Sequence, residues 1–123
     1  MAARFGFLRS RTGDTVSWRL LTTNNRDLGR APGEFPDRDT CRTAASWVRE
    51  HAAELRVTLT RTGSAGWRWR MSAGDLVVAV SSRDYQRRIQ AKHAAEVVLV
   101  LLAEAEMFGM QQAEDGRGAG GIA

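Results

Sequence analysis

The chain of 123 residues contains a single cysteine, two prolines, one tyrosine and one lysine. The lone Cys41 cannot form an internal disulfide, and no second cysteine or histidine stands at the spacing of a zinc site, which fits a reducing compartment. The longest apolar run, residues 97–103, is far too short to cross a bilayer, and the N-terminus has no apolar stretch of a signal peptide. We therefore expect a cytoplasmic protein with no membrane span, metal or other cofactor.

The near absence of lysine makes the positive charge almost entirely arginine. The net charge is +4, but residues 1–95 are strongly basic, whereas residues 96–123 hold one arginine and are acidic overall. A basic body is typical of nucleic-acid-binding proteins, yet an excess of arginine over lysine also follows from a GC-rich coding sequence. We favour the compositional explanation for most of this charge.

The strongest feature that is present is an internal repeat at an offset of about 50 residues. The sequence RTG at residues 11–13 returns at residues 61–63, and WRL at residues 18–20 returns as WRM at residues 69–71. The correspondence continues with Phe35 and Tyr85, Arg38 and Arg88, Ala44 and Ala94, Ala45 and Ala95, and Val48 and Val98. A unit of this size is marginally stable alone, so we expect the two copies to share one core.

The hydrophobic pattern of each copy predicts three strands followed by a helix. Alternating apolar residues and turn residues predict strands around residues 5–7, 16–22, 27–31, 55–59, 66–72 and 76–81. The helices are expected to run from the N-cap Asp37 to about Ala53, and from Gln86 to about Met107. The order predicts an α+β fold of tandem β-β-β-α repeats, with an antiparallel sheet and two helices packed on one face.

The predicted boundaries follow from the repeat. The first β-β-β-α repeat covers residues 1–54 and the second covers residues 55–108. Residues 109–123 are rich in glycine, alanine and acids and have little to bury, so we predict a disordered tail.

The ordered motifs resemble those of the YegP-like domain of unknown function. That family's pattern is an aromatic-Arg-Leu strand, an Asn-Gly turn, a short apolar strand and a Gly-Glu-aromatic-x-Ser-Arg/Lys segment that opens an alanine-spaced helix. Copy one matches at residues 18–20, Asn24, Asn25, Leu28, residues 33–35, Arg38, Cys41 and Val48. Copy two matches at residues 67–71, residues 74–77, Ser82, Tyr85, Arg88, Ala91 and Val98.

The resemblance covers roughly residues 5–104 and has three departures. Asn25 replaces the turn glycine, Gln86 and Arg87 replace the serines before Arg88, and the second hairpin is shorter by about one or two residues. The resemblance implies a tandem β-β-β-α body that is often a homodimer, with no established activity or catalytic residues.

A weaker resemblance appears when the chain is followed from its first predicted helix. The order then becomes α-β-β-β-α, as in a double-stranded RNA-binding domain, and residues 87–95 are similar to that family's second helix. Only one of the expected lysines is present, the Gly-Pro-His type of loop is missing, and residues 1–36 are left unexplained. We therefore rank the YegP-like resemblance first.

Basic side chains on the strands and on the second helix are candidates for binding nucleic acid or another anion. Strand alternation places Arg68 and Arg70 opposite the predicted core face, and Arg19 has the matching position in copy one. Guanidinium groups bind phosphates, but a solvated face, or pairing with acids such as Asp27 and Asp75, is the interpretation that we favour. The candidate set is Arg19, Arg68, Arg70, Arg87, Arg88 and Lys92.

The second predicted helix is apolar nearly all round at residues 97–102, which is more surface than one sheet can cover. We expect the other helix and a second copy of the chain to cover it. The candidate self-association residues are Ile89, His93, Val97, Val100 and Leu101.

Few residues here suit catalysis. We expect His93 to be buried and hydrogen-bonded, His51 to cap the first helix, Cys41 to pack in the core, and the tryptophans to form the core rather than stack on bases. No phosphate loop, nucleophile elbow or metal triad is present in the sequence.

Three functions stay open. The favoured one is a non-catalytic tandem module that forms a homodimer and binds a protein partner. The alternative is a nucleic-acid or anion-binding accessory protein that uses the arginine face. An enzyme is the least favoured of the three.

Overall fold

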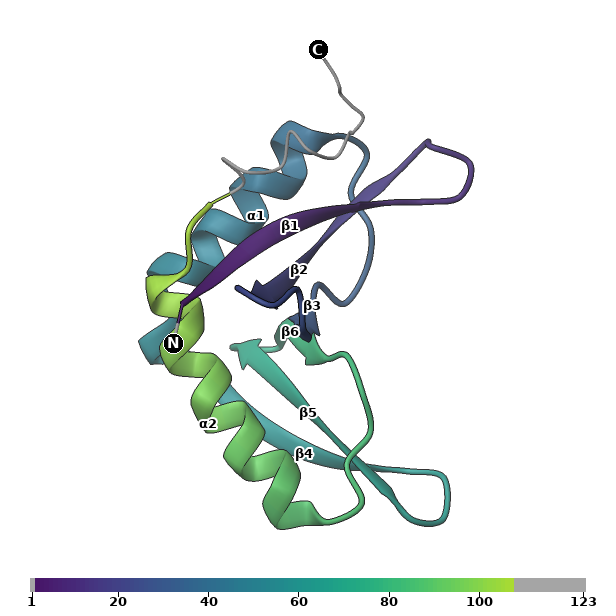
Figure 1. Cartoon of the computed structure of the whole chain (residues 1–123), viewed down its shortest axis with the longest axis vertical. Helices are drawn as coiled ribbons and strands as arrows, with labels where there is room; N and C mark the ends of the chain where they lie inside the picture. The colour runs from purple at the N-terminus through teal and green to yellow at the C-terminus, as the bar shows by residue number, and fades with distance from the viewer. Residues whose placement is uncertain (1, 108–123) are drawn as a thin grey trace.

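Six strands pair antiparallel into one sheet, in the order β1-β2-β3-β6-β5-β4, and two helices accompany it (Figure 1). The computed structural model describes residues 2–107, so the tail predicted at residues 109–123 lies outside the described residues. The fold is α+β, as the sequence predicts. The elements are β1 (Ala3–Arg9), β2 (Val16–Thr22), β3 (Asp27–Arg30), α1 (Arg38–Glu50), the short 3₁₀ helix η1 (Ala52–Glu54), β4 (Arg56–Thr62), β5 (Gly66–Ala73), β6 (Leu76–Ser81) and α2 (Arg88–Glu104).

The sheet has two three-stranded halves that meet at β3 and β6. These two central strands share only two residue pairs, Gly29 with Ser81 and Arg30 with Val80. Each half has one irregularity beside its short strand, where the register with β2 skips Leu28 and the register with β5 skips Val78. Because the skip occurs at the same point in both halves, each residue of β3 can be matched with an equivalent residue of β6.

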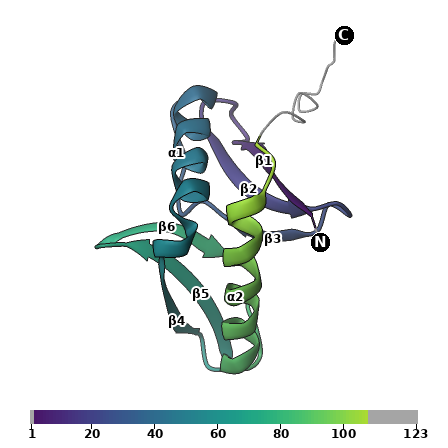
Figure 2. The same cartoon turned by 90° about the vertical axis from the view of Figure 1, so that its left-hand side faces the viewer.

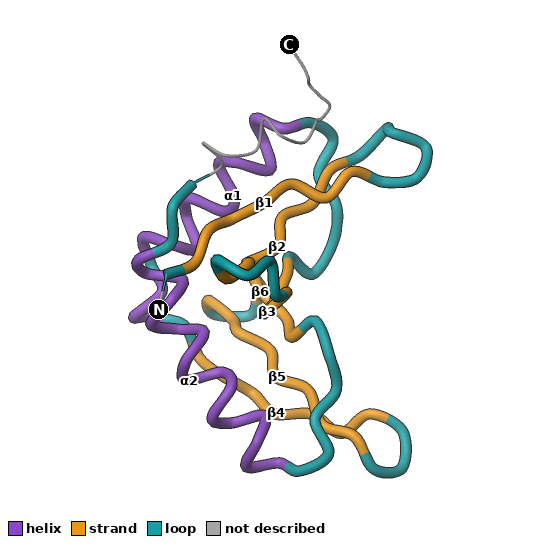
Figure 3. Tube along the Cα trace, in the orientation of Figure 1, coloured by secondary structure: helices purple, strands orange, loops and turns teal. Residues whose placement is uncertain are grey.

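Both helices lie on the same side of the sheet (Figures 2 and 3). Helix α1 packs on β2, α2 packs on β5 and β4, and the two helices contact each other. The core between the layers is built around Trp18, Trp69, Phe5, Leu20 and Met71, all essentially without exposed surface. Period-two alternation sends these side chains inward, as predicted for Trp18 and Trp69. The prediction fails for Trp67, which is half-buried, and for Trp47, which is 39% exposed.

The predicted turns and caps of the first copy are confirmed. Asn25 closes the hairpin between β2 and β3 with φ of 63°, a left-handed conformation that asparagine tolerates better than most residues. The carboxylate of Asp37 accepts a hydrogen bond from the Thr40 amide at 2.8 Å and caps α1. His51 ends that helix, and its Nδ1 lies 2.8 Å from the carbonyl oxygen of Trp47.

The second helix is shorter than the sequence predicts. It begins at Arg88 because Tyr85 still exchanges backbone hydrogen bonds with Trp67. It ends at Glu104 because the next residues turn onto the edge of β1, where the Glu106 amide donates to the Ala3 carbonyl at 3.0 Å. Among the described residues, neither helix has the length and apolar character needed to span a bilayer.

Candidate functional site

The three strand arginines differ in their surroundings. Arg68 and Arg70 are exposed on the sheet face opposite the helices, as predicted. The Arg68 side chain forms an ion pair with Asp84, not with Asp75. The side chain of Arg70 has no hydrogen bond or ion pair to another residue in the range 2–107.

Arg19 belongs to a polar network at the centre of the sheet. Its guanidinium lies 3.9 Å from the carboxylate of Asp27, and that of Arg30 lies 2.9 Å from the same carboxylate. The Ser82 hydroxyl also donates to Asp27, and the Arg30 Nε donates to Ser82 at 3.3 Å. We call this set, Arg19, Asp27, Arg30 and Ser82, the central network. Its single carboxylate is shared by the guanidinium groups of Arg19 and Arg30, so Arg19 has an acidic neighbour that lies closer to Arg30.

Two of the three basic residues at the start of α2, Arg88 and Lys92, have local side-chain partners. Lys92 forms an ion pair with Glu96 at 2.9 Å, one helical turn along. The Arg88 guanidinium lies 6.0 Å from the centre of the Trp67 ring, and the backbone amide of Arg87 donates to the Gln90 side chain. These residues belong to the helix layer, whereas Arg19 and Arg70 face away from it, so the six candidates do not form one surface.

Helix α2 exposes an apolar stripe. Ile89, Val97 and Val100 are 49, 50 and 59% exposed, and His93 lies between them on the same side of the helix. We call Ile89, His93, Val97 and Val100 the α2 stripe. The prediction that His93 is buried is wrong, because its apolar neighbours one turn away are themselves exposed.

Leu101 was also a candidate for this interface. It is 5% exposed and belongs to the core. The helix turns its Val98, Leu101 and Leu102 side toward the sheet, which separates Leu101 from the exposed stripe. The prediction that Leu101 belongs to an exposed interface is therefore wrong.

The two halves each have a groove between a helix and the short strand of the other half. One groove, of about 330 Å³, lies between α2 and β3, and polar groups of Arg26, Asp27, Arg83 and His93 line part of it. The other, of about 460 Å³, lies between α1, β6 and the loop that follows β3. We call the second one the α1 groove. It is almost entirely apolar, and its lining residues are Trp18, Pro32, Gly33, Glu34, Phe35, Ala44, Trp47, Val48, Leu76, Val77 and Val78.

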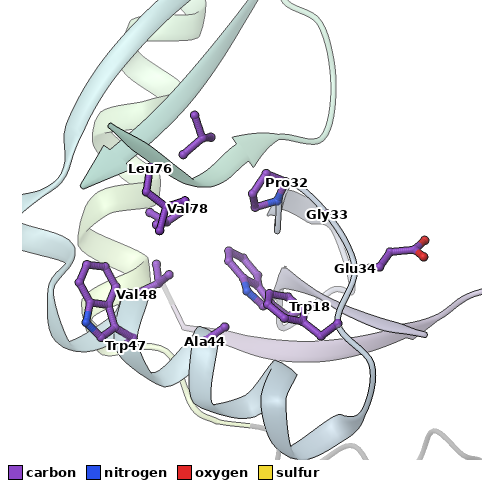
Figure 4. Close-up of a pocket in the computed structure, with 11 residues that line it drawn as sticks. Trp18, Pro32, Gly33, Glu34, Ala44, Trp47, Val48, Leu76 and Val78 are labelled. Atoms are coloured by element: carbon purple, nitrogen blue, oxygen red, sulfur yellow. The ribbon is translucent and has the colours of Figure 1, made fainter. Parts of the chain in front are cut away.

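The α1 groove has two exposed apolar side chains at its rim. Trp47 is 39% exposed and Leu76 is 67% exposed. Figure 4 shows Trp47, Val48 and Val78 around the hollow, with the carboxylate of Glu34 directed away from it. That carboxylate accepts a hydrogen bond from Thr15. The groove therefore offers apolar surface with no charged group directed into it.

This groove was not predicted from the sequence. Trp47 fell within the first predicted helix and Leu76 at the start of the strand predicted at residues 76–81. The signal in the sequence was a mismatch between the copies. Val77 stands where the first copy has Asp27, and Val80 stands where it has Arg30.

The remaining reactive side chains are held in structural roles. Cys41 is fully buried in the core, as predicted, and burial raises the pKa of its thiol to about 12. A thiol with that pKa is protonated at neutral pH and is a poor nucleophile. Within residues 2–107, no group of three or more histidine, cysteine or acidic side chains is placed to hold a metal ion.

Comparison with known proteins finds likeness in structure but none in sequence. No protein-family model and no curated protein sequence matches the chain. The solution structure of a UPF0339 protein from Shewanella oneidensis is similar, with a TM-score of 0.72, 10% identity, and coverage of 87% of this chain and 90% of that one. The yegP protein of unknown function from E. coli has a TM-score of 0.71 and 14% identity, with coverage of 87% and 91%. The chain therefore has a YegP-like fold.

Proposed function

We propose that this chain is a non-catalytic binding module that forms a homodimer through the α2 stripe and binds a protein partner. The observation that carries the proposal is the exposure of Ile89, Val97 and Val100 along one side of α2. Contiguous exposed apolar surface on a small protein marks an interaction site. The same stripe, met by a second copy related by a two-fold axis, is its own complement.

The charges beside the stripe fit a symmetric interface. Lys92 and Glu96 are exposed, carry opposite charges, and lie one helical turn apart next to the stripe. When two α2 helices cross antiparallel, Lys92 of each copy comes opposite Glu96 of the other. Charges of both signs at the rim of an apolar contact favour one register of association.

The experiment is sedimentation velocity of the full chain over a wide range of concentration. We expect the wild type to associate and Val97→Glu to remain monomeric, because a carboxylate in the middle of the stripe is buried without a partner in the dimer. Leu76→Glu is the matched control, since Leu76 is more exposed and lies outside the stripe. A wild type that stays monomeric at the highest concentration overturns the dimer.

An anion-binding role is the second candidate, and one observation favours it. Arg70 is exposed and, unlike Arg19 and Arg68, has no acidic partner in residues 2–107. Binding to duplex RNA, duplex DNA and single strands is measured at several salt concentrations. Functional binding weakens steeply with salt and weakens further in Arg70→Ala. Absence of binding at low salt removes this candidate.

A further inference from the structure

The two ends of the β3–β6 junction differ in the side-chain contacts that hold the two segments together. At one end, Asp27 at the start of β3 binds Ser82 just after β6, with Arg30 bonded to both. The central network thus ties the two segments together where the strand pairing stops. The groove on this side is the smaller and the more polar of the two.

The other end lacks the chemistry for such a network. Positions equivalent to Asp27, Arg30 and Ser82 are Val77, Val80 and Pro32. Valine and proline side chains have no hydrogen-bonding groups, and Pro32 also lacks an amide proton, so the chain after β3 cannot extend the ladder with β6. The α1 groove opens at this place and is lined by both Pro32 and Val77.

A strand edge borders the α1 groove. On one side of β6, Leu76 and Val77 pair with β5 while Val78 is skipped, but on the other side the pairing with β3 includes only Val80 and Ser81. In the described part of the chain, the second edge of residues 76–78 therefore has no strand beside it. Such an edge presents backbone donors and acceptors that another extended chain can pair with.

We propose that the α1 groove binds an extended segment of a partner protein, which adds a short strand to the free edge of β6. Alternate apolar side chains of that segment pack against Trp47, Val48 and Val78, while its backbone pairs with residues 76–78. The inference rests on the proposed role as a protein-binding module. It uses a surface separate from the α2 stripe, so either can fail without the other.

An extended peptide fits the site better than a small apolar molecule does. A small apolar molecule fills the cavity but leaves the strand edge unpaired, whereas a peptide satisfies both surfaces at once. The exposed side chains of Leu76 and Trp47 at the rim also widen the apolar surface of the groove. A chain several residues long can cover this surface.

The test uses a random peptide display library selected against the full chain, followed by titration of the enriched synthetic peptides. We expect enriched peptides to carry apolar residues at alternate positions. Binding should weaken about tenfold or more in Leu76→Asp. Circular dichroism checks that this exposed position leaves the fold intact. Val97→Asp is the matched control and should bind peptide as the wild type does, which also separates this result from the dimer.

Amide hydrogen exchange of the peptide complex supplies the second readout. Strand addition should slow exchange at residues 77 and 78, and peptide binding should change the fluorescence of Trp47. The proposal is overturned if no peptide is enriched, or if enriched peptides bind Leu76→Asp as they bind the wild type. It is also overturned if only a small apolar dye binds near Trp47 and the β6 amides gain no protection.

Discussion

Gly29 lies against the indole ring of Trp69, so closely that a Cβ atom placed on Gly29 would stand 2.7 Å from Cη2 of that ring. Trp69 is fully buried and has no room to move aside. Gly29→Ala is therefore expected to destabilise the fold by about 1–3 kcal/mol, because extra volume in a packed core forces neighbours off their preferred geometry. Urea unfolding measures the loss.

Gly33 supplies the control for this prediction. A Cβ atom on Gly33 meets nothing within 4 Å, and the residue has no left-handed backbone conformation. Gly33→Ala should therefore unfold at the wild-type urea concentration or slightly above it. If Gly29→Ala were as stable as Gly33→Ala, the close approach of Trp69 would be wrong.

Most of the fold was predictable because local chemistry determines it. Alternation placed Trp69 inside and Arg68 outside, and the capping carboxylate of Asp37 marked the start of α1. The order of the strands was harder, since turn residues define the hairpins but not which strands meet across the centre. The junction of β3 with β6 depends on tertiary packing that no local pattern encodes.

The candidate site was less predictable than the fold. The acid that pairs with Arg68 is Asp84, which comes from a separate segment, whereas the sequence analysis named Asp27 and Asp75 as possible partners of the strand arginines. His93 has apolar neighbours on its own face of α2, but the rotation of the helix about its axis is set by packing against β5. The α1 groove arises from the parting of two strands, which appears only in the assembled sheet.

The N-cap of α1 predicts a pH-dependent loss of stability. Hydrogen bonds from Thr40 lower the pKa of the Asp37 carboxyl below its ordinary value. The stabilising effect of the charged cap is therefore complete above the pKa of the unfolded chain and disappears as the pH falls through the lower pKa of the folded chain. The stability difference between wild type and Asp37→Asn should be positive at neutral pH and should vanish once the pH lies below the lowered pKa of the folded chain.

Urea unfolding across this pH range measures the effect of Asp37. Asp75→Asn is the control, because Asp75 lies in the turn between β5 and β6 and caps no helix. Its difference from the wild type should change less with pH. A difference for Asp37→Asn that stays constant down to the acid limit would show that the charge of the cap plays no part.

Cys41 should be unreactive in the folded protein. Its side chain is fully buried, and burial raises the pKa of the thiol to about 12, so little thiolate exists at neutral pH. We expect a disulfide reagent to modify Cys41 orders of magnitude more slowly in the native protein than in urea. A native thiol that reacts as fast as free cysteine contradicts the burial and would reopen a nucleophilic role.

Asp27 and Asp84 provide a matched test of the central network. Both carboxylates bind an arginine, but their surroundings differ. The Asp27 side chain is 24% exposed, accepts hydrogen bonds from Arg30 and Ser82, and forms an ion pair with Arg19. The Asp84 side chain is 52% exposed and binds one arginine. Asp27→Ala leaves Arg19 and Arg30 facing each other across the β2–β3 ladder without a compensating charge. We expect it to lower the free energy of unfolding by about 1–3 kcal/mol.

Asp84→Ala removes an exposed ion pair and should lower the free energy of unfolding by less than about 1 kcal/mol. Urea unfolding of the two variants decides the point. Equal losses would mean that the network contributes no more than a surface ion pair, and that something other than the network keeps the α2 side of the β3–β6 junction closed.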